Sequence, residues 1–181
     1  PADGGTTGYD CISSYGNAKN ILTVGAVSDI SGGYSQPSDI NMSSFSGWGP
    51  TDDGRIKPDI VANGVSLYSS GSMNNTDYYN SSGTSMSTPN TTGTLALIQE
   101  MYNDSNGSFI MAATLKGLVI HTANEAGTAD GPDYQHGWGL LNAKGAADLI
   151  ADSVGSRIIE DTLSNQGTVT YSFFADGNQD V

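Results

Sequence analysis

The stretch Gly83-Thr84-Ser85-Met86-Ser87-Thr88-Pro89 leads into residues 95–102, a run able to form a helix, and together they decide the fold. This order places the Ser85 hydroxyl at a helix N-terminus, where backbone N–H groups are unpaired and the helix dipole is positive. Such a position suits the oxyanion that forms when a serine attacks a carbonyl group. Gly83 permits a tight turn, and Pro89 is tolerated near a helix start. Ser85 is therefore a candidate nucleophile, although the same pattern also fits an ordinary N-cap.

Four further segments stand around this motif in a defined order. They are Asn20-Ile21-Leu22-Thr23-Val24-Gly25-Ala26-Val27, Phe45-Ser46-Gly47-Trp48-Gly49-Pro50-Thr51, Lys57-Pro58-Asp59-Ile60-Val61-Ala62-Asn63-Gly64-Val65 and Gly137-Trp138-Gly139-Leu140-Leu141-Asn142-Ala143. Together with the serine motif, these segments resemble the subtilisin-like serine proteases, the subtilase family. The resemblance runs from about residue 17 to residue 147 and covers most of the chain. It implies that the chain is the C-terminal part of a subtilase catalytic domain.

The resemblance implies a Ser-His-Asp hydrolase in which the Asp comes first along the chain, then the His, then the Ser. No His-Gly-Thr-His, Asp-Thr-Gly or Asp-Ser-Gly segment precedes Ser85. We therefore expect the His, the Asp and the family's side-chain oxyanion donor, an Asn, upstream of Pro1. The N-terminal part of the same protease would then be an obligatory partner, and residues 1–181 alone would be inactive.

The chain has two histidines, and both fit structural roles better than catalysis. His121 follows the apolar run at residues 115–120, so it is expected at a helix C-terminus, where the dipole favours it. His136 precedes Gly137 at a position where subtilases carry an ordinary polar or aromatic residue, which favours a structural or surface role. Asp59, which leads a strand expected to be buried, is interpreted as a structural hydrogen-bonding residue.

Buried apolar strands and helices indicate a layered α/β fold. The resemblance makes this a three-layer subtilisin-like fold with a mainly parallel sheet, of which only the C-terminal part is present. Strands are expected at residues 21–27, 42–45, 60–62, 65–69 and 78–80, and helices at about 85–102, 110–122 and 143–151. The first helix is expected to end at the polar turn of residues 103–107.

Two units are expected along the chain. Residues 1–153 form the C-terminal part of the peptidase domain, and the pattern changes after Ser153. Alternating residues predict strands at 157–161 and 168–174, with a turn at residues 164–167 between them. This resembles the opening hairpin of an accessory β-sandwich, so residues 154–181 are interpreted as the beginning of a truncated β-rich domain.

Composition limits the partners. The chain of 181 residues has a formal net charge of −13, from 19 acidic and 6 basic residues. Nucleic-acid binding needs Lys and Arg clusters, which this sequence lacks, and no apolar run approaches the roughly 18 residues of a membrane helix. The single cysteine, Cys11, cannot form an internal disulfide. A secreted or cell-surface location is therefore expected only from the resemblance.

No cofactor is needed for the chemistry that the resemblance implies, although subtilisin-like enzymes commonly bind structural calcium. The oxygen-rich loops at residues 74–77 and 130–133 are candidates, but we assign no metal ligand. The segment at 103–107 does not follow the spacing of an EF-hand loop, so it is interpreted as a helix-joining turn.

The sequence thus predicts a serine endopeptidase that hydrolyses proteins or peptides through an acyl-enzyme on Ser85. By alignment with the family, the loop at residues 12–16 contributes small polar residues to the pocket that receives the substrate side chain before the cleaved bond. A catalytically inactive, subtilase-like binding module is the main alternative, and the upstream sequence would separate the two. A different serine hydrolase of the Gly-x-Ser-x-Gly type is weakly supported, because Ser87 takes the place of the second glycine.

Overall fold

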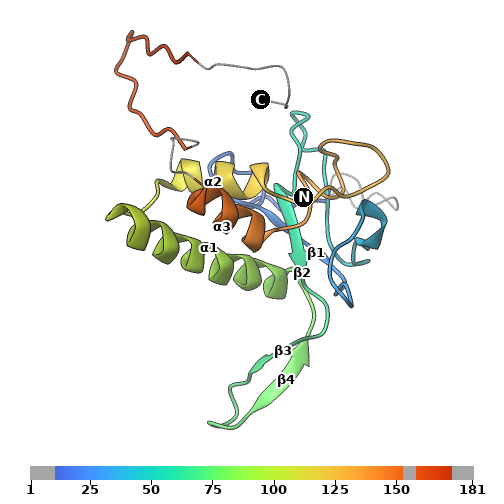
Figure 1. The fold of residues 1–181 in the computed structure, drawn as a ribbon. Coiled ribbons are helices and arrows are strands. Elements are labelled where there is room, and N and C mark those ends of the chain that lie inside the picture. The colour runs from blue at the N-terminus through green and yellow to red at the C-terminus, as the bar shows by residue number, and fades with distance from the viewer. Residues whose placement is uncertain (1–10, 153–157, 173–181) are drawn as a thin grey trace.

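A computed structural model describes residues 11–152 and 158–172 (Figure 1). Its elements, in chain order, are β1 (Val24–Val27), the 3-10 helix η1 (Pro37–Asp39), β2 (Ile60–Asn63), β3 (Leu67–Ser70), β4 (Tyr78–Ser81), α1 (Thr84–Asn106), α2 (Ala112–His121) and α3 (Ala143–Ala151). The expected strands at 60–62 and 78–80 and the expected helix at 143–151 are confirmed. The strand expected at 21–27 is shorter than predicted, because only its second half pairs with a neighbour.

The central sheet consists of β1 and β2, which pair in parallel from Val24 opposite Ile60 to Val27 opposite Asn63. The opposite edge of β2 is bonded to the loop before α3. There the Val61 N–H donates to the Gly139 carbonyl, and the Leu141 N–H donates to the Val61 carbonyl, each at 2.9 Å. This parallel pairing confirms the α/β fold class that the sequence predicts.

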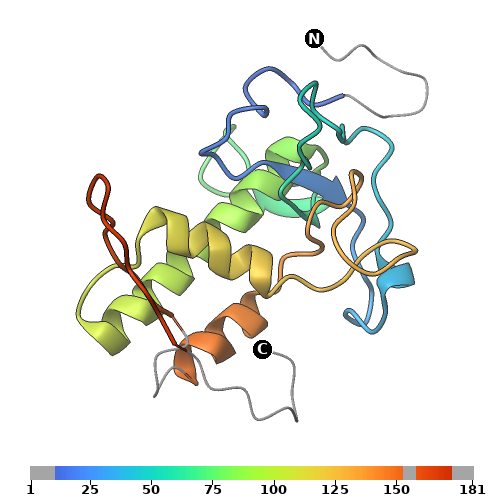
Figure 2. The ribbon, with the colours of Figure 1, turned by 90° about the horizontal axis from the view of Figure 1, so that it is seen from above.

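The sheet is covered on both faces, as expected for parallel strands. On one face, Ile60 and Ala62 belong to a core that includes Ile98 of α1, Val119 of α2 and further residues of α3. Seen from above, the three helices lie together on this side (Figure 2). On the other face, Val61 packs in a second core with residues of the loops that follow β1 and α2. Alternate residues of β2 therefore point into two different cores.

Helix α1 packs against β1 and β2, and the type of residue that it buries changes along its length. Near its N-terminus the buried residues are small and polar, Ser87 and Thr91, and further along the helix Ile98 is buried. The helix ends at Gly107, whose φ of 71° fits a left-handed C-terminal residue. Although α1 has 23 residues, neither it nor another helix in the described segments is long and apolar enough to span a membrane.

Strands β3 and β4 form an antiparallel hairpin that projects from the body (Figure 1). Leu67 lies opposite Ser81, and Ser69 lies opposite Tyr79. The rings of Tyr68 and Tyr78 stack with their centroids 5.7 Å apart. Because two-stranded hairpins are marginal by themselves, this stacking and the attachment at the base of the hairpin stabilise it.

Two expected strand regions differ from the structure. Residues 42–45 form no strand: Met42 makes one antiparallel bridge to Val27, and the chain then turns. The Ala26 N–H is bonded instead to the Ser46 hydroxyl at 3.0 Å, so a side chain replaces the expected strand partner. No strand forms within residues 158–172, although the turn at 164–167 is present. Arg157 and residues 173–174 lie outside the described residues, and the second domain stays a prediction.

Gly137 provides a test of how tightly the loop before α3 packs against the start of β2. Its φ is +66°, and a Cβ there would lie 2.3 Å from the Pro58 carbonyl oxygen and 2.5 Å from that of Asp59. Gly131, in the same loop, has a φ of +88° but open space around it. We expect Gly131→Ala to cost about 1–2 kcal/mol from its backbone conformation alone. Gly137→Ala should cost at least about 1 kcal/mol more because of the clash.

Urea unfolding of both variants measures this difference. Equal losses in the free energy of unfolding would show that the loop moves away from β2 at little cost, contrary to the close packing seen here.

Candidate active site

Ser85 is the second residue of α1, and its position follows from the glycine that precedes the helix. Gly83 has φ 153° and ψ 163°, a conformation that is essentially restricted to glycine. Its carbonyl accepts the Met86 and Ser87 N–H groups, at 2.9 and 3.3 Å. Within the described residues, the N–H groups of Thr84 and Ser85 have no acceptor. The exposed Ser85 side chain therefore lies beside unpaired donors at the positive end of a helix of 23 residues.

The turn that carries Ser85 is anchored to the central sheet. The Gly83 N–H donates to the Gly64 carbonyl at 2.8 Å, and the Gly64 N–H donates to the Val27 carbonyl at 3.0 Å. The Ser66 N–H also bonds the Ser82 hydroxyl at 2.8 Å, which closes the base of the hairpin. The position of the candidate nucleophile is thus fixed by backbone bonds to β1 and to the residue after β2.

Ser87 differs sharply from Ser85 although it lies only two residues further on. Its side chain is fully buried, and its hydroxyl bonds the Thr84 carbonyl at 3.1 Å. The Ser87 carbonyl in turn accepts the Thr91 hydroxyl at 3.0 Å. Ser87 is therefore part of the packing between α1 and the sheet, and its hydroxyl is not accessible to a substrate.

Two cavities adjoin the serine turn. The first, of about 340 Å³, lies between the hairpin and the first turns of α1, and Ser85 itself lines it. The second, of about 400 Å³, is lined by Thr84 and Thr88 and by residues of the segments 11–16 and 21–24. The loop at residues 12–16, which the sequence assigns to a substrate pocket, therefore lies beside the serine turn. All residues that line either cavity are uncharged.

The two histidines lie elsewhere. His121 is the last residue of α2, as the sequence predicts, and it is exposed. His136 is buried, with its Nδ1 atom 3.1 Å from the Asp133 carboxylate, which also accepts the backbone N–H groups of Gln135 and His136. This His–Asp pair organises the loop before α3. Neither histidine lines a cavity next to Ser85.

Comparison with known proteins agrees with this arrangement. The model of the subtilase family of peptidases matches residues 5–139. The chain belongs to the subtilase family. This finding confirms the resemblance that the ordered motifs indicate.

The subtilase chain is similar to several larger proteases. C5a peptidase of Streptococcus pyogenes serotype M3 is 31% identical over 166 residues, which are 85% of this chain and 14% of that protein. The PII-type proteinase of Lactococcus lactis subsp. cremoris is 31% identical over 135 residues, 66% of this chain and 7% of the proteinase. The chain therefore spans only a small part of the length of these two relatives.

Two solved structures share the fold of this subtilase chain. The Clostridium perfringens CspB protease has a TM-score of 0.65 and 26% identity, over 80% of this chain and 30% of that one. The patellamide maturation protease PatA has a TM-score of 0.61 and 25% identity, over 80% of this chain and 48% of that one. Both agree with the parallel sheet and the helices described above.

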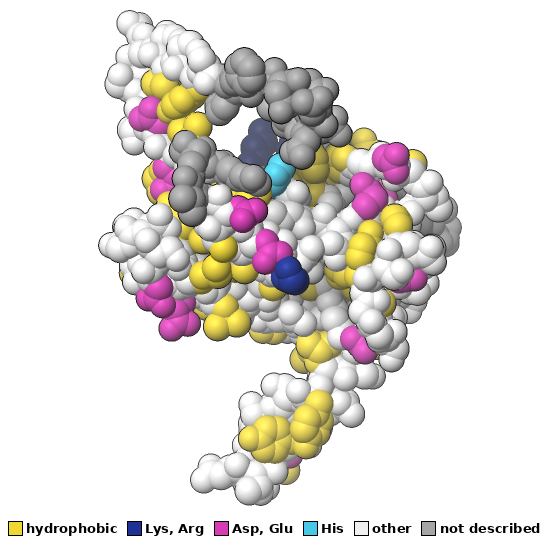
Figure 3. Space-filling model, viewed as in Figure 1, with side chains coloured by type: hydrophobic (Ala, Val, Ile, Leu, Met, Phe, Trp, Pro, Cys, Tyr) yellow, Lys and Arg dark blue, Asp and Glu magenta, His cyan; other side chains and the backbone are white. Residues whose placement is uncertain are grey.

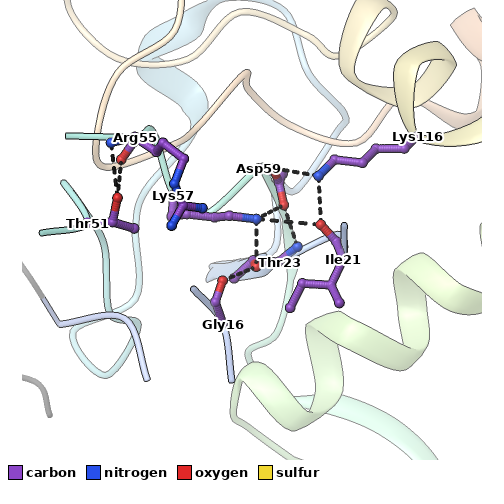
Figure 4. A network of polar contacts seen from close by, with 8 residues as sticks. All are labelled: Gly16, Ile21, Thr23, Thr51, Arg55, Lys57, Asp59 and Lys116. Atoms are coloured by element: carbon purple, nitrogen blue, oxygen red, sulfur yellow. Dashed lines mark hydrogen bonds and ion pairs between the residues drawn. The ribbon is translucent and has the colours of Figure 1, made fainter. Parts of the chain in front are cut away.

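A buried ion-pair network is bonded to residues that line the second cavity of the subtilase chain (Figure 4). Lys57 is 2% exposed, and its ammonium lies 2.6 Å from the Asp59 carboxylate and 3.1 Å from the Thr23 hydroxyl. Asp59 also accepts the Thr23 N–H at 2.6 Å and pairs with Lys116 of α2 at 3.1 Å. Thr23 in turn bonds the Gly16 carbonyl at 2.8 Å. The structural role predicted for Asp59 is confirmed, and the network fixes the segments that line the cavity.

Several side-chain oxygen atoms of the two candidate calcium loops accept hydrogen bonds from within the protein. In the loop between β3 and β4, Asn74 accepts from Thr76, and Asp77 accepts the Met73 N–H at 3.0 Å. In the loop before α3, the Asp133 carboxylate is engaged with His136 as described. No group of three acidic, His or Cys side chains gathers within the described residues. A calcium ion in either loop stays a prediction, and we assign no ligand to it.

Proposed function

We propose that this subtilase chain carries the nucleophile of a serine endopeptidase, Ser85, which forms an acyl-enzyme with protein or peptide substrates. The proposal rests on one observation: an exposed hydroxyl at the second residue of a long helix, beside two unpaired backbone N–H groups and between uncharged cavities. The similarity to C5a peptidase and to the CspB protease supports peptide-bond hydrolysis as the reaction.

In this mechanism the Ser85 Oγ atom attacks the carbonyl carbon of the peptide bond while a histidine removes the hydroxyl proton. The oxyanion is stabilised by the Ser85 backbone N–H and by an asparagine side chain. The histidine then gives the proton to the leaving amine as the C–N bond breaks. Water attacks the resulting ester in a second step, which releases the acid and restores Ser85.

In this proposal, three residues lie outside these 181: the histidine, the aspartate that orients it and the asparagine that binds the oxyanion. The absence of both histidines of this chain from the cavities beside Ser85 supports that assignment. We place the complete protease at the cell surface or outside the cell, where it meets protein substrates. If the outside residues were replaced by others, the same fold would serve as a catalytically inactive binding module.

Labelling with a serine-directed phosphonate tests the proposal. We expect the full-length protein to be labelled, with the adduct on Ser85, because phosphonates react with serines that are activated by a base. Tandem mass spectrometry of the labelled peptide distinguishes Ser85 from Ser87, whose buried hydroxyl is an internal control. Residues 1–181 expressed alone should remain unlabelled for lack of the base.

Failure of the full-length protein to react would favour the inactive binding module. An adduct on Ser85 of residues 1–181 alone would instead show that this chain contains its own base, and would overturn the assignment of the histidine.

A further inference from the structure

A third cavity, of about 340 Å³, lies between the C-terminal end of α2 and the loop before α3. We call it the α2 pocket, and its lining residues fall within 117–125 and 131–138. They include the exposed His121, the carboxylic acid Glu125 and Trp138, which is 46% exposed. Among the described residues, none that lines this pocket also lines either cavity beside Ser85. The α2 pocket is therefore distinct from the candidate active site.

Glu125 supplies the fixed charge of the α2 pocket. Its Oε1 atom accepts the Ala126 N–H, and its Oε2 atom accepts the Gly131 N–H, each at 3.0 Å. The Glu125 carbonyl accepts the Tyr34 hydroxyl at 3.0 Å, so the backbone is held as well. These bonds orient the carboxylate, and each of its oxygen atoms keeps a lone pair for a further donor. Among the described residues that line the pocket, Glu125 is the only Asp, Glu, Lys or Arg.

The surroundings of Glu125 favour a positive ligand. The pocket borders the C-terminal end of α2, a helix of 10 residues, where the helix dipole is negative. Lys116 of α2 does not neutralise this end, because its ammonium bonds the Ile21 carbonyl at 2.6 Å and pairs with Asp59 at 3.1 Å. On the face shown in Figure 3, acidic side chains are spread over the surface and basic ones are few. The net charge of −13 attracts cations in the same way.

Trp138 supplies an aromatic surface to the same pocket. Its backbone N–H donates to the Asp59 carbonyl at 2.9 Å, which ties it to the start of β2. The neighbouring Gly137 is packed closely against the same segment, as described above. An indole ring is the best aromatic partner for a cation. The pocket thus combines an oriented carboxylate with an accessible indole ring.

Other classes of ligand fit this lining poorly. Calcium takes about six to eight oxygen ligands, whereas the pocket offers one carboxylate, and no group of three acidic, His or Cys side chains gathers within residues 11–152 and 158–172. A neutral apolar ligand would cover the Glu125 carboxylate without pairing it, which is costly. An organic cation satisfies both the carboxylate and the ring.

We propose that the α2 pocket binds an organic cation, a guanidinium or ammonium group, which pairs with the Glu125 carboxylate and contacts the Trp138 ring. The group belongs either to a basic side chain of a peptide or to a small free cation, since both present the same chemistry. The inference does not depend on Ser85, and it applies to an active protease and to an inactive binding module alike.

Ligand-observed NMR titration of the full-length protein tests this proposal. The measurement uses Ser85→Ala protein, to prevent hydrolysis, at pH 8, where imidazole side chains are ordinarily neutral. We expect N-acetylarginine amide to bind with a Kd of about 1 mM or tighter. N-acetylcitrulline amide has nearly the same shape without the charge, and it should bind at least about 10-fold more weakly. A peptide with one arginine among glycines distinguishes the sources: tighter binding than the amide indicates a peptide side chain, and equal binding indicates a free cation.

Substitutions locate the bound cation. Glu125→Gln should weaken binding of the arginine derivative by about 10-fold or more, because the ionic partner is lost. Trp138→Ala should weaken it by about 3-fold, and Trp138→Phe should retain most of the affinity. Glu100→Gln is the matched control: it makes the same change at an exposed position of α1 that does not line this pocket, and it should keep the original Kd. Melting temperatures establish that each variant is folded.

Equal binding of the arginine and citrulline derivatives, or no binding of either arginine ligand, would overturn the proposal. Binding that both Glu125→Gln and Trp138→Ala leave unchanged would also overturn it, because the ligand would then lie elsewhere. If Glu125→Gln does not fold, the citrulline comparison and Trp138→Ala decide the question on folded protein. Phosphonate labelling of Ser85 is measured separately, so either proposal can fail without the other.

Discussion

Replacing Ser85 with alanine should abolish peptide hydrolysis by the full-length protein. The change removes the atom that would form the acyl-enzyme, and the nearby Ser87 hydroxyl is fully buried and cannot replace it. For subtilisin, a member of the same family, loss of the nucleophile lowers kcat by on the order of 10⁶-fold. We expect a decrease of that order here, measured as kcat on a quenched fluorescent peptide.

Ser87→Ala is the natural control, because Ser87 belongs to the same turn but is fully buried. It should change the melting temperature slightly, through the lost bond to the Thr84 carbonyl, and leave kcat within a few-fold of wild type. If Ser85→Ala retained more than about a hundredth of the wild-type kcat, Ser85 could not be the nucleophile, since the triad acts as a unit.

The serine turn could be predicted from the sequence because its signals are local. Gly83 and the residues after it specify a turn into a helix, and the helix begins at Thr84, one residue from the expected start. Its end was predicted four residues too early. The polar residues 103–106 resemble a turn, but they continue the helix, and the Asn106 side chain bonds the Tyr102 carbonyl at 3.0 Å. The helix ends only at Gly107, a residue that readily adopts a positive φ.

The cavity between the hairpin and α1 could not be predicted in the same way, whereas the loop at residues 12–16, which lines the other cavity, was assigned to a substrate pocket by alignment. The hairpin cavity depends on the bond between the Gly83 N–H and the Gly64 carbonyl, and a backbone bond across 19 residues leaves no side-chain pattern in the sequence. Because Tyr78 and Tyr79 are neighbours in an expected strand, the sequence places their side chains on opposite faces of it. It did not show which face turns toward α1.

The strands expected after residue 157 show the limit of alternation as a signal. The pattern at residues 168–172 favours a strand, yet a strand needs a partner, and within the described residues this segment has only a turn and the bond from Tyr171 to Asp161 at 2.6 Å. An isolated hairpin of this length is marginal in water. Local propensity alone therefore does not form a strand at residues 168–172, which have no strand partner among the described residues.

Asp59→Ala should produce a large loss of stability. The variant would leave the Lys57 ammonium, which is 2% exposed, without its carboxylate partner. It would also leave the Thr23 N–H without an acceptor. Removal of one partner of a buried ion pair costs about 3–5 kcal/mol in the free energy of unfolding, which urea titration measures.

Asp53→Ala supplies the matched control. Asp53 also pairs with a cation, Arg55, at 2.9 Å, and the hydrogen bond from Arg55 lowers its pKa to about 2. The Asp53 side chain is 51% exposed and that of Arg55 is 31% exposed, so solvent screens this pair, and its loss should change stability much less than Asp59→Ala at neutral pH. Equal effects of the two variants would contradict a buried, energetically important role for Asp59.

A pH series and a second substitution, Lys57→Met, distinguish the cost of an unpaired Lys57 charge from the cost of the lost bond to Thr23. Burial lowers the pKa of Lys57, and the hydrogen bond and charge of Asp59 oppose that shift. Without Asp59 the pKa should fall further below the ordinary value of 10.5. The unfolded chain then binds this proton more tightly than the folded one, so the free energy of unfolding rises with pH toward 10.5.

The defect of Asp59→Ala should therefore shrink at alkaline pH, and Lys57→Met in the same background should restore part of the lost stability. A defect that is independent of pH and unchanged by Lys57→Met would instead place the loss in the bond to Thr23.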